Sequence, residues 1–380
     1  MTGNDIIQDQ ISAVRVSSCT DCTARINLLF PEKEELEYLK QFNHLFWLRD
    51  IIPNKFVFGT YDNSEKFVVP HENIIIYRMI NSSNGDYVRF IGHEGLRAAY
   101  GLHAVKKHVF TREIWIPVSK SEFHWKWKQG RFLECIRLNI SKGQDSPVIP
   151  DSYVDNMAIF RDFLEYYRAT PFLFSGTLLG WYRECSFIKD TTDVDMAMRI
   201  TSLDPVMLKH MEKSSEFKLH WILGKVNDSL EVSIYSGNIK IDLFFLYENK
   251  DSAWVGGMMV TERKKLRWFY PPIMQICTGD LLGRLFHVPC NVEEILEAEY
   301  GNWRVPHPTA NFIWYKSHKN IHEAGYWSKN DWNDVAVFIL IRKQVKEYDV
   351  RGKRDFYTLQ VNDRLLYVRV TDRPFTGTVI

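Results

Sequence analysis

The sequence predicts an α+β protein, in which a mixed sheet with flanking helices follows a smaller β-rich domain. Residues 25–138 contain short β-branched and aromatic runs separated by turn-forming residues. A stretch with Gly and Pro breakers, residues 143–150, then interrupts this pattern. Beyond it, apolar residues at helical spacing alternate with short apolar runs, which is typical of helices that pack on a sheet.

These signals divide the chain into four expected segments. Residues 1–23 are polar and aperiodic, and we expect a disordered tail there. Residues 24–145 are expected to form the β-rich N-terminal domain and residues 146–335 the larger mixed domain. Residues 336–380 are expected to form a β appendage, because they contain two β-branched and aromatic runs. These runs are residues 356–361 and 365–370.

In the β-rich domain we expect one helix, over residues 34–48, followed by several strands. Each predicted strand is a β-branched or aromatic run, and turn signals separate the runs. The predicted strands are residues 55–58, 66–69, 73–77, 87–91 and 113–117. No motif in this domain points to chemistry.

The mixed domain is predicted to open with an amphipathic helix, because apolar side chains recur on one helical face and Pro171 ends the pattern. That face consists of Tyr153, Met157, Phe160, Leu164 and Tyr167. Strands and helices then alternate. They are a strand at 172–174, a turn into a helix at 175–184, a strand at 193–200, a helix at 205–214 and a hairpin of 230–235 and 239–247.

Composition and charge exclude several classes of function. The 380 residues include 48 Lys and Arg against 47 Asp and Glu, so a global basic field for nucleic acid is not supported. The longest apolar run, residues 335–341, is far short of the roughly 20 residues that a membrane-spanning helix needs. Residues 1–18 have neither the basic start nor the apolar stretch of a signal peptide. We therefore expect no membrane span or N-terminal anchor in this sequence.

The six cysteines leave the redox state open. Cys19 and Cys22 form a lone CxxC pair, and no second pair lies nearby to complete a zinc finger. Cys277 and Cys290 are candidates for a disulfide if the compartment is oxidising. The alternative is that both are buried free thiols, which suits a cytosolic protein.

Three carboxylates and one turn carry the main chemical signal. Asp193 and Asp195 alternate along a predicted strand, so their side chains share one face. Asp242 lies on a later strand that is otherwise mostly apolar, where a buried acid needs a partner. Upstream, Gly176 and Thr177 lie at a strand-to-helix turn, where a phosphate can approach the backbone and the helix N-terminus favours an anion.

This ordered set is the arrangement of nucleotidyltransferases, in which carboxylates hold Mg²⁺ or Mn²⁺ for phosphoryl chemistry. Acids that repel each other at short range are best tolerated with a divalent cation between them. Each piece alone has an ordinary structural alternative. The Asp pair can be a solvated face, and Asp242 can form a salt bridge with Lys240. The combination favours a metal site.

Several segments of the sequence resemble the LicD/fukutin family. The clearest are Phe174-Ser-Gly-Thr-Leu-Leu-Gly-Trp-Tyr-Arg-Glu-Cys185 and, after it, Thr192-Asp-Val-Asp195. The similarity continues in residues 224–231, 240–248, 254–257, 287–290 and 299–306, and less distinctively in 130–135. The resemblance covers residues 120–335 and implies a nucleotidyltransferase-like fold for this part of the chain.

The resemblance also implies a metal-dependent transferase. Such an enzyme would move a phosphorylated alcohol, of the ribitol 5-phosphate or phosphocholine type, from a CDP-alcohol donor to a hydroxyl of a glycan or glycoprotein, releasing CMP. By position, Asp193, Asp195 and Asp242 would bind Mg²⁺ or Mn²⁺, and Gly176 and Thr177 would line the phosphate side. The alternative is a non-catalytic fukutin-like scaffold that binds a glycan or a partner glycosyltransferase. Fukutin-like members act in protein O-mannosylation in the Golgi, where an N-terminal membrane helix holds them.

Two cations in the matched segments are further candidates for the donor site. Arg183 offers a bidentate fork to a diphosphate, and its alternative is a salt bridge to Glu184 or Asp190. Lys225 lies in a matched segment with Glu231, and the resemblance assigns neither a role.

Aromatic residues near position 300 allow two interpretations. Tyr300, Gly301 and Trp303 are candidates for a sugar-stacking surface. The alternative, which we favour for Trp303, is the end of a helix that Asn291 caps and Gly301 stops.

Overall fold

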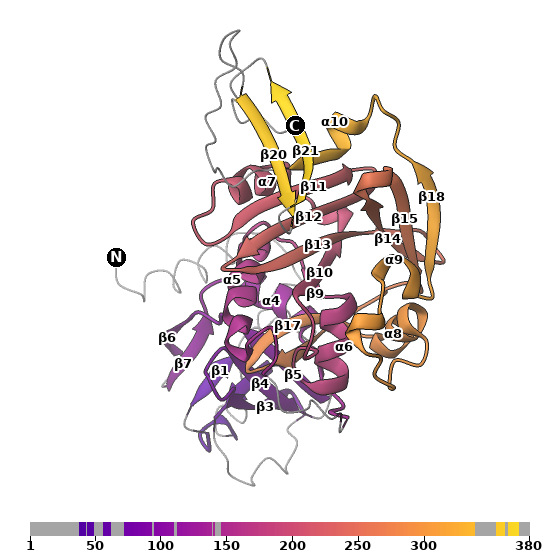
Figure 1. The fold of residues 1–380 in the computed structure, drawn as a ribbon. Helices are drawn as coiled ribbons and strands as arrows, with labels where there is room; N and C mark the ends of the chain where they lie inside the picture. The colour runs from indigo at the N-terminus through magenta and orange to yellow at the C-terminus, as the bar shows by residue number, and fades with distance from the viewer. Residues whose placement is uncertain are drawn as a thin grey trace. The chain divides into compact units, whose positions relative to one another are not determined.

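The protein divides into two compact units, Met1–Leu133 and Glu134–Ile380, in a computed structural model (Figure 1). The structure describes residues 38–42, 44–48, 56–61, 72–92, 95–109, 112–138, 140, 146–338, 355–361 and 364–371. The predicted tail at 1–23, which includes the CxxC pair, and the predicted strand at 66–69 lie outside these residues.

The N-terminal unit is built around one sheet with the strand order β5-β4-β3-β2-β1-β7-β6. Its strands are β1 Leu45–Trp47, β2 Phe56–Thr60, β3 Ile74–Asn81, β4 Tyr87–Gly92, β5 Gly95–Tyr100, β6 Ala104–Val109 and β7 Arg112–Pro117. Along β2, Val57 packs in one apolar cluster, whereas Phe56 and Phe58 pack in another. Helix α4, Lys120–Gln129, contributes two aromatic side chains to the cluster of Val57. Apolar clusters therefore form on both faces of this sheet.

The strands predicted at 55–58, 73–77, 87–91 and 113–117 are confirmed as β2, β3, β4 and β7. The helix predicted over 34–48 is wrong in its second half. Tyr38 and Leu39 are helical, but Leu45–Trp47 form β1. This strand pairs antiparallel with β2 and parallel with β7. Hydrogen bonding on both of its edges outweighs the helical spacing of its apolar residues.

The second unit contains a mixed sheet with helices around it, which confirms the predicted α+β class (Figure 1). The main strand order is β18-β15-β14-β13-β10-β9-β17-β16, and β12, β11 and β19 continue as a branch from β13. The strands are β9 Phe172–Leu173, β10 Asp193–Arg199, β11 Lys218–Lys225, β12 Asp228–Ser236, β13 Ile239–Glu248, β14 Ala253–Met259, β15 Lys264–Tyr270, β16 Ile276–Leu281, β17 Arg284–Pro289, β18 Ile321–Tyr326 and β19 Ala336–Phe338. The α-helices are α5 Val154–Tyr166, α6 Ser175–Glu184, α7 Pro205–Glu212, α8 Val292–Tyr300, α9 Trp314–Ser317 and α10 Trp332–Val335.

The elements predicted between positions 153 and 247 are confirmed as α5, β9, α6, β10, α7 and the β12–β13 hairpin. The antiparallel strands β20, Asp355–Val361, and β21, Arg364–Thr371, match the two runs predicted near the C-terminus. Strands β11 and β14 to β18 have no counterpart in the predictions. Among the described residues, no helix is both long enough and apolar enough to cross a membrane.

The polar face that carries the candidate site lies opposite a row of fully buried apolar residues on β10 and β13. The fully buried residues on the two strands include Val194, Met196, Met198, Ile241, Leu243 and Phe245. Because neighbouring side chains of a strand point to opposite faces, the intervening residues share the other face. That face carries Asp193 and Asp195 on β10 and Lys240 and Asp242 on β13.

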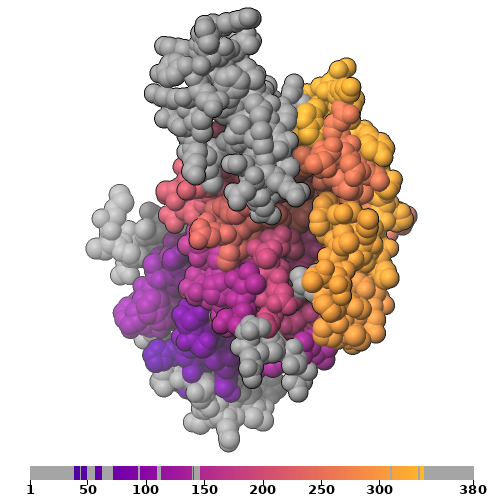
Figure 2. Space-filling view, viewed as in Figure 1, coloured from indigo at the N-terminus to yellow at the C-terminus, as the bar shows by residue number. Residues whose placement is uncertain are grey.

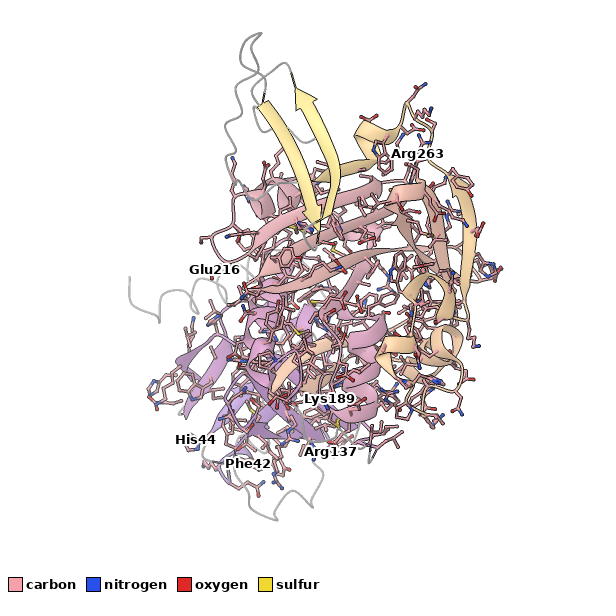
Figure 3. All side chains as sticks on the ribbon, in the orientation of Figure 1. Phe42, His44, Arg137, Lys189, Glu216 and Arg263 are labelled. Carbon is pink, nitrogen blue, oxygen red and sulfur yellow. A yellow bond between two sulfur atoms is a disulfide. The ribbon has the colours of Figure 1, made fainter. Side chains whose placement is uncertain are left out.

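Helix α6, which follows the predicted phosphate-side turn, is anchored by a buried tryptophan. The side chain of Trp181 is fully buried, and its Nε1 donates to the carbonyl oxygen of Asp280 at 2.8 Å. The indole lies against Gly279, where an added Cβ would be only 2.1 Å from the ring. Side chains fill the interior between the sheet and the helices of this unit (Figure 3). The dense packing holds α6 in a defined position relative to the sheet.

Two disulfides lie in the second unit. The predicted pair, Cys277 and Cys290, is bonded, with its Cα atoms 5.0 Å apart. A second disulfide joins Cys135 to Cys185, whose Cα atoms are 5.5 Å apart. Cys185 ends α6 in the left-handed conformation, with a φ of 53°. This second bridge therefore ties the C-terminal end of α6 to a segment 50 positions earlier in the chain.

Candidate active site

The three predicted acids lie on two adjacent parallel strands. In the register of β10 and β13, Asp193 is opposite Lys240 and Asp195 is opposite Asp242. All four side chains share one face of the sheet, so the fold brings together the acids that the sequence places in separate motifs.

Lys240 is the cation within this group of acids. Its Nζ lies 2.7 Å from Asp242 Oδ2 and 3.6 Å from Asp193 Oδ2. The Ser233 hydroxyl, from β12, donates a hydrogen bond to Asp242 Oδ1. Burial alone would lower the pKa of Lys240, but the charges of Asp242 and Asp193 raise it instead. The ammonium is therefore held in its charged form as a counter-ion for the acids.

A fourth carboxylate, Glu231, stands near the same group. It lies on β12, two residues before Ser233, and the Trp221 indole donates to its Oε1 at 3.3 Å. Burial, followed by repulsion from Asp242, raises the pKa of Glu231 to about 8. The sequence places Glu231 in a matched segment, but its closeness to the Asp group depends on the pairing of β12 with β13.

The electrostatics of the site suit a bound cation. Burial raises the pKa of Asp195 well above its usual range, and the charges of Asp193 and Asp242 add to this effect. The pKa of Asp193 is also raised, first by burial, although Lys240 opposes the shift. Carboxylate oxygens are the ligands that Mg²⁺ and Mn²⁺ prefer, so the donor types fit such an ion. In the described part of the chain, however, no three His, Cys, Asp or Glu side chains already form a metal-holding group.

The turn at the start of α6 is bonded directly to Asp195. The backbone N–H of Gly176 donates to Asp195 Oδ2 at 3.1 Å, and the backbone N–H of Asp195 donates to Thr177 Oγ1 at 2.8 Å. An added Cβ at Gly176 would lie 3.3 Å from Asp195 Oδ2, so glycine permits this close approach. The structure thus joins the predicted phosphate-side residues to one of the three acids.

Arg183 and Lys225 both have carboxylate partners. Two nitrogens of Arg183 donate to Glu184 Oε1, at 2.6 and 3.2 Å, and a third donates to the carbonyl oxygen of Trp303 at 3.1 Å. The Arg183 side chain is buried, and the Glu184 pairing is one of the two alternatives considered from the sequence.

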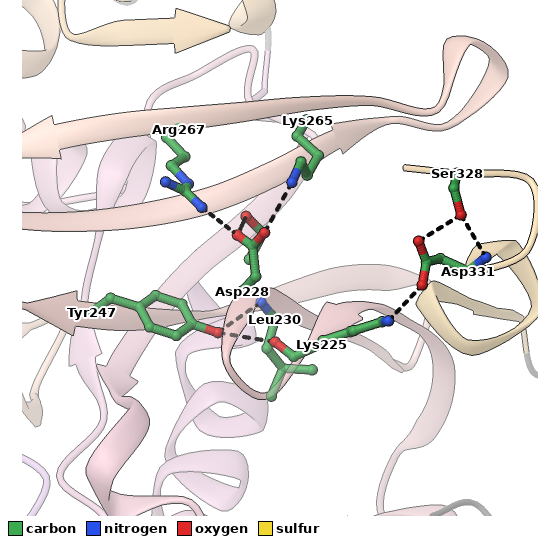
Figure 4. Close-up of polar contacts among 9 residues, drawn as sticks. Lys225, Asp228, Leu230, Tyr247, Lys265, Arg267, Ser328 and Asp331 are labelled. Carbon is green, nitrogen blue, oxygen red and sulfur yellow. Dashed lines mark hydrogen bonds and ion pairs between the residues drawn. The ribbon is translucent and has the colours of Figure 1, made fainter. Parts of the chain in front are cut away.

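Lys225 takes part in a polar network around the β11–β12 turn (Figure 4). Its Nζ donates to Asp331 Oδ1 at 2.8 Å, and its carbonyl oxygen accepts from the Tyr247 hydroxyl at 3.2 Å. On the other side of the turn, Asp228 accepts from Arg267 at 2.7 Å and from Lys265 at 3.1 Å. These bonds hold the turn in place, and they pair Lys225 with Asp331.

The aromatic segment after α8 follows the helix-end interpretation. Trp303 is only 1% exposed, so its ring offers no face to a sugar. Gly301 ends α8 at a φ of 68°, a conformation that glycine adopts without strain. The sequence predicts that the Asn291 side chain caps this helix, and this prediction is wrong. The side chain makes no capping hydrogen bond and instead donates to Glu294 Oε2 at 2.9 Å.

Glu299 is a buried acid near the site that the sequence analysis did not single out. The Ser175 hydroxyl, at the start of α6, donates to Glu299 Oε1 at 2.6 Å. Burial raises the pKa of Glu299 to about 7. The sequence does contain one indication of this buried acid. Glu299 lies on the apolar face of a predicted helix, at the start of the matched segment 299–306.

Comparison with known proteins identifies a family domain in the second unit. A family model described as LicD/FKTN/FKRP, nucleotidyltransferase domain, matches residues 168–291, a range that contains the Gly176 turn and the three Asp residues. An uncharacterized protein of Caenorhabditis elegans is 31% identical over an alignment of 306 positions, which covers 75% of this chain and 78% of that protein. The chain belongs to the LicD/fukutin family. The resemblance proposed from the sequence motifs is thereby confirmed.

Two other LicD/fukutin relatives are named ribitol-5-phosphate transferase FKTN. The protein of Mus musculus is 33% identical over 236 residues, and that of Homo sapiens is 31% identical over 235 residues. In both comparisons the match covers 59% of this chain and 50% of the relative. The chain therefore spans about half the length of these two relatives.

Proposed function

We propose that this member of the LicD/fukutin family is a metal-dependent transferase. It would move a phosphorylated alcohol, of the ribitol 5-phosphate or phosphocholine type, from a CDP-linked donor to a glycan hydroxyl and release CMP. The observation that carries the proposal is the pairing of Asp195 with Asp242 across parallel strands, with the Gly176 N–H directed at Asp195. The name of the related FKTN proteins supports the same class of reaction.

The carboxylates are proposed to hold Mg²⁺ or Mn²⁺. Asp193, Asp195 and Asp242 would supply oxygen ligands, and a bound ion would neutralise negative charge on the donor diphosphate. The support is electrostatic, because burial and mutual repulsion raise the pKa of Asp195, and a divalent cation would relieve this repulsion. Lys240 would then share its two carboxylate partners with the ion.

The proposed reaction is a displacement at phosphorus. The acceptor hydroxyl oxygen forms a bond to the phosphorus that carries the alcohol, while the bond from that phosphorus to the CMP oxygen breaks. The electron pair of the broken bond leaves with CMP, and the hydroxyl proton passes to a carboxylate, for which we propose Asp242. The Gly176 turn and the N-terminus of α6 would orient the donor phosphate. We assign no donor contact to Arg183 or Lys225, because both are engaged in ion pairs.

We further propose that the reaction takes place in an oxidising compartment. The two disulfides support this, because such bonds persist in the secretory pathway and are rare in the cytosol. Together with the family membership, they favour the Golgi and a protein-linked O-mannosyl glycan as the acceptor.

The function is tested by CMP release from CDP-ribitol and from CDP-choline in the presence of Mn²⁺. We expect Asp193→Asn and Asp195→Asn each to lower the rate by more than about 100-fold, since changes even to residues that only support a metal ligand cost up to that much. The melting temperature should stay close to that of the wild type. A matched control is Asp251→Asn, because Asp251 is exposed in a loop.

Two outcomes would contradict the proposal. Full activity in either Asn variant would remove that residue from the proposed metal site. If the wild-type protein released no CMP from either donor and its melting temperature did not rise with Mn²⁺ and donor, the scaffold alternative would be favoured.

A further inference from the structure

The backbone at the start of α6 is held in an unusual conformation. Ser175, the first residue of α6, has a φ of 42°, in the left-handed region that serine rarely adopts. A residue in such a region persists only where the surrounding structure holds it there. The next residue is Gly176, whose N–H donates to Asp195, so the conformation of Ser175 directs the hydrogen bond that reaches the candidate site.

The contact that holds Ser175 comes from α8, 124 positions later in the chain. The Ser175 hydroxyl donates to Glu299 Oε1 at 2.6 Å and lies 3.1 Å from the Tyr300 hydroxyl. Helices α6 and α8 pack against each other, and Glu299 is 1% exposed. The orange segment that carries α8 runs along one side of the second unit in Figure 2. The short hydrogen bond therefore links the first residue of α6 to a side chain that is buried within α8.

Glu299 is itself held from two sides. Its carbonyl oxygen accepts from the backbone N–H of Lys319 at 2.7 Å. His318 Nε2 lies 3.4 Å from Glu299 Oε1, and Trp268 Nε1 donates to His318 Nδ1 at 2.7 Å. Because an indole nitrogen can only donate, Nδ1 of His318 accepts and Nε2 carries the ring proton, but Nε2 makes no hydrogen bond to Glu299. Hydrogen bonds thus join Trp268 to His318 and Ser175 to Glu299, and His318 lies beside Glu299 without a hydrogen bond between them.

We propose that Glu299 is a positioning residue for the transfer reaction and acts through Ser175. It holds the turn that directs Gly176 at Asp195 and places Thr177 against the Asp195 backbone. This inference rests on the proposed function for the identity of the reaction. The anchoring of the turn by Glu299 does not depend on the reaction and can be measured without substrate.

The substrate-free test is hydrogen exchange of the metal-free protein, followed by mass spectrometry. In Glu299→Ala and in Ser175→Ala, amides of the peptide that covers residues 174–178 should exchange at least about tenfold faster than in the wild type, because the turn loses its anchor. Glu299→Gln keeps an oxygen acceptor for the Ser175 hydroxyl, so its exchange should lie close to that of the wild type. The control is Glu297→Ala, on the exposed face of the same helix.

The activity test uses the same variants and measures CMP release in Mn²⁺. Glu299→Ala and Ser175→Ala should each lower kcat by about tenfold to a hundredfold, the usual cost of a small misplacement near reacting groups. Glu299→Gln should recover most of the lost rate, because it keeps an oxygen acceptor for the Ser175 hydroxyl. The double variant should lose no more than either single variant, because both changes remove one shared contact.

The outcomes separate the two claims. Unchanged exchange in Glu299→Ala overturns the positioning role, whatever the activity. Faster exchange with an unchanged kcat in an active protein overturns it as well, since the turn would then not matter to the reaction. An inactive wild type whose turn still loosens in Glu299→Ala would support the anchoring of the turn by Glu299 and count against the proposed function alone.

Discussion

Asp195 and Asp242 lie opposite each other on two adjacent parallel strands, although 47 positions separate them in the chain. Lys240, two residues before Asp242 on the same strand, forms an ion pair with Asp242 at 2.7 Å. The site therefore has both a repulsive contact, between the acids, and an attractive one, to the ammonium. The stability of the metal-free site depends on the balance between this repulsion and this attraction.

Replacing Asp242 by Asn should destabilise the metal-free protein, because Lys240 would lose the nearer of its two carboxylate partners. We expect a loss of about 1.5–3 kcal/mol in the free energy of unfolding, the usual range for a hydrogen bond to a charged group. Urea unfolding in EDTA measures this change, and CMP release in Mn²⁺ should be lost in the same variant. An unchanged or increased stability would show that the relief of repulsion among the acids outweighs the lost ion pair.

Replacing Lys240 by Met should lower stability in EDTA and less so in Mn²⁺. Without the ammonium the acids have lost a counter-ion, and a bound divalent cation would replace its charge. The measurement is the melting temperature of the variant and the wild type with and without Mn²⁺. Lys106→Met is a suitable control, because Lys106 pairs with Glu113 at the surface and such pairs contribute little. An equal loss with and without Mn²⁺ would argue against a metal at this site.

Breaking either disulfide should destabilise the protein, with a larger effect for the longer loop. The entropy of loop closure gives about 3 kcal/mol for the Cys277–Cys290 bridge and about 4 kcal/mol for Cys135–Cys185, which spans 50 positions. Double Cys→Ala variants of each pair, compared by denaturant unfolding without reductant, provide the measurement. Reductant should lower the stability of the wild type toward that of the variants. A wild type whose stability does not respond to full reduction would contradict this prediction.

The stability of the metal-free protein should fall as the pH rises through the range set by Glu299. Burial raises the pKa of this carboxyl from 4.5 to about 7, so between these values the folded protein retains a proton that the unfolded chain releases. Stability therefore decreases with rising pH in this window, by up to about 3 kcal/mol. Glu299→Gln should remove this part of the slope, whereas Glu297→Gln should not. Urea unfolding at several pH values in EDTA measures the slope, and an unchanged slope in Glu299→Gln would contradict the assignment.

Local pattern accounts for most of the elements around the site. The helical spacing of Met157, Phe160 and Leu164 predicts α5, and these side chains are fully buried in the structure. The alternation around Asp193 and Asp195 predicts β10 in the same way. Such periodicity can be read from the sequence because it depends only on residues a few positions apart. The helix predicted over 34–48 shows where local periodicity fails as a predictor. Pairing with β2 and β7 makes Leu45–Trp47 a strand.

The sequence by itself determined the family, the order of the acidic motifs and the faces on which Asp193 and Asp195 lie. Only the tertiary structure decided which partners the charged groups take. It pairs Arg183 with Glu184, places Lys240 beside Asp242 and joins Ser175 to Glu299 across 124 positions. The physical reason is that a local pattern specifies which face a side chain occupies, whereas its partner depends on how distant elements pack. Cys135 and Cys185 are joined for the same reason, since their separation in sequence gives no indication of their distance in space.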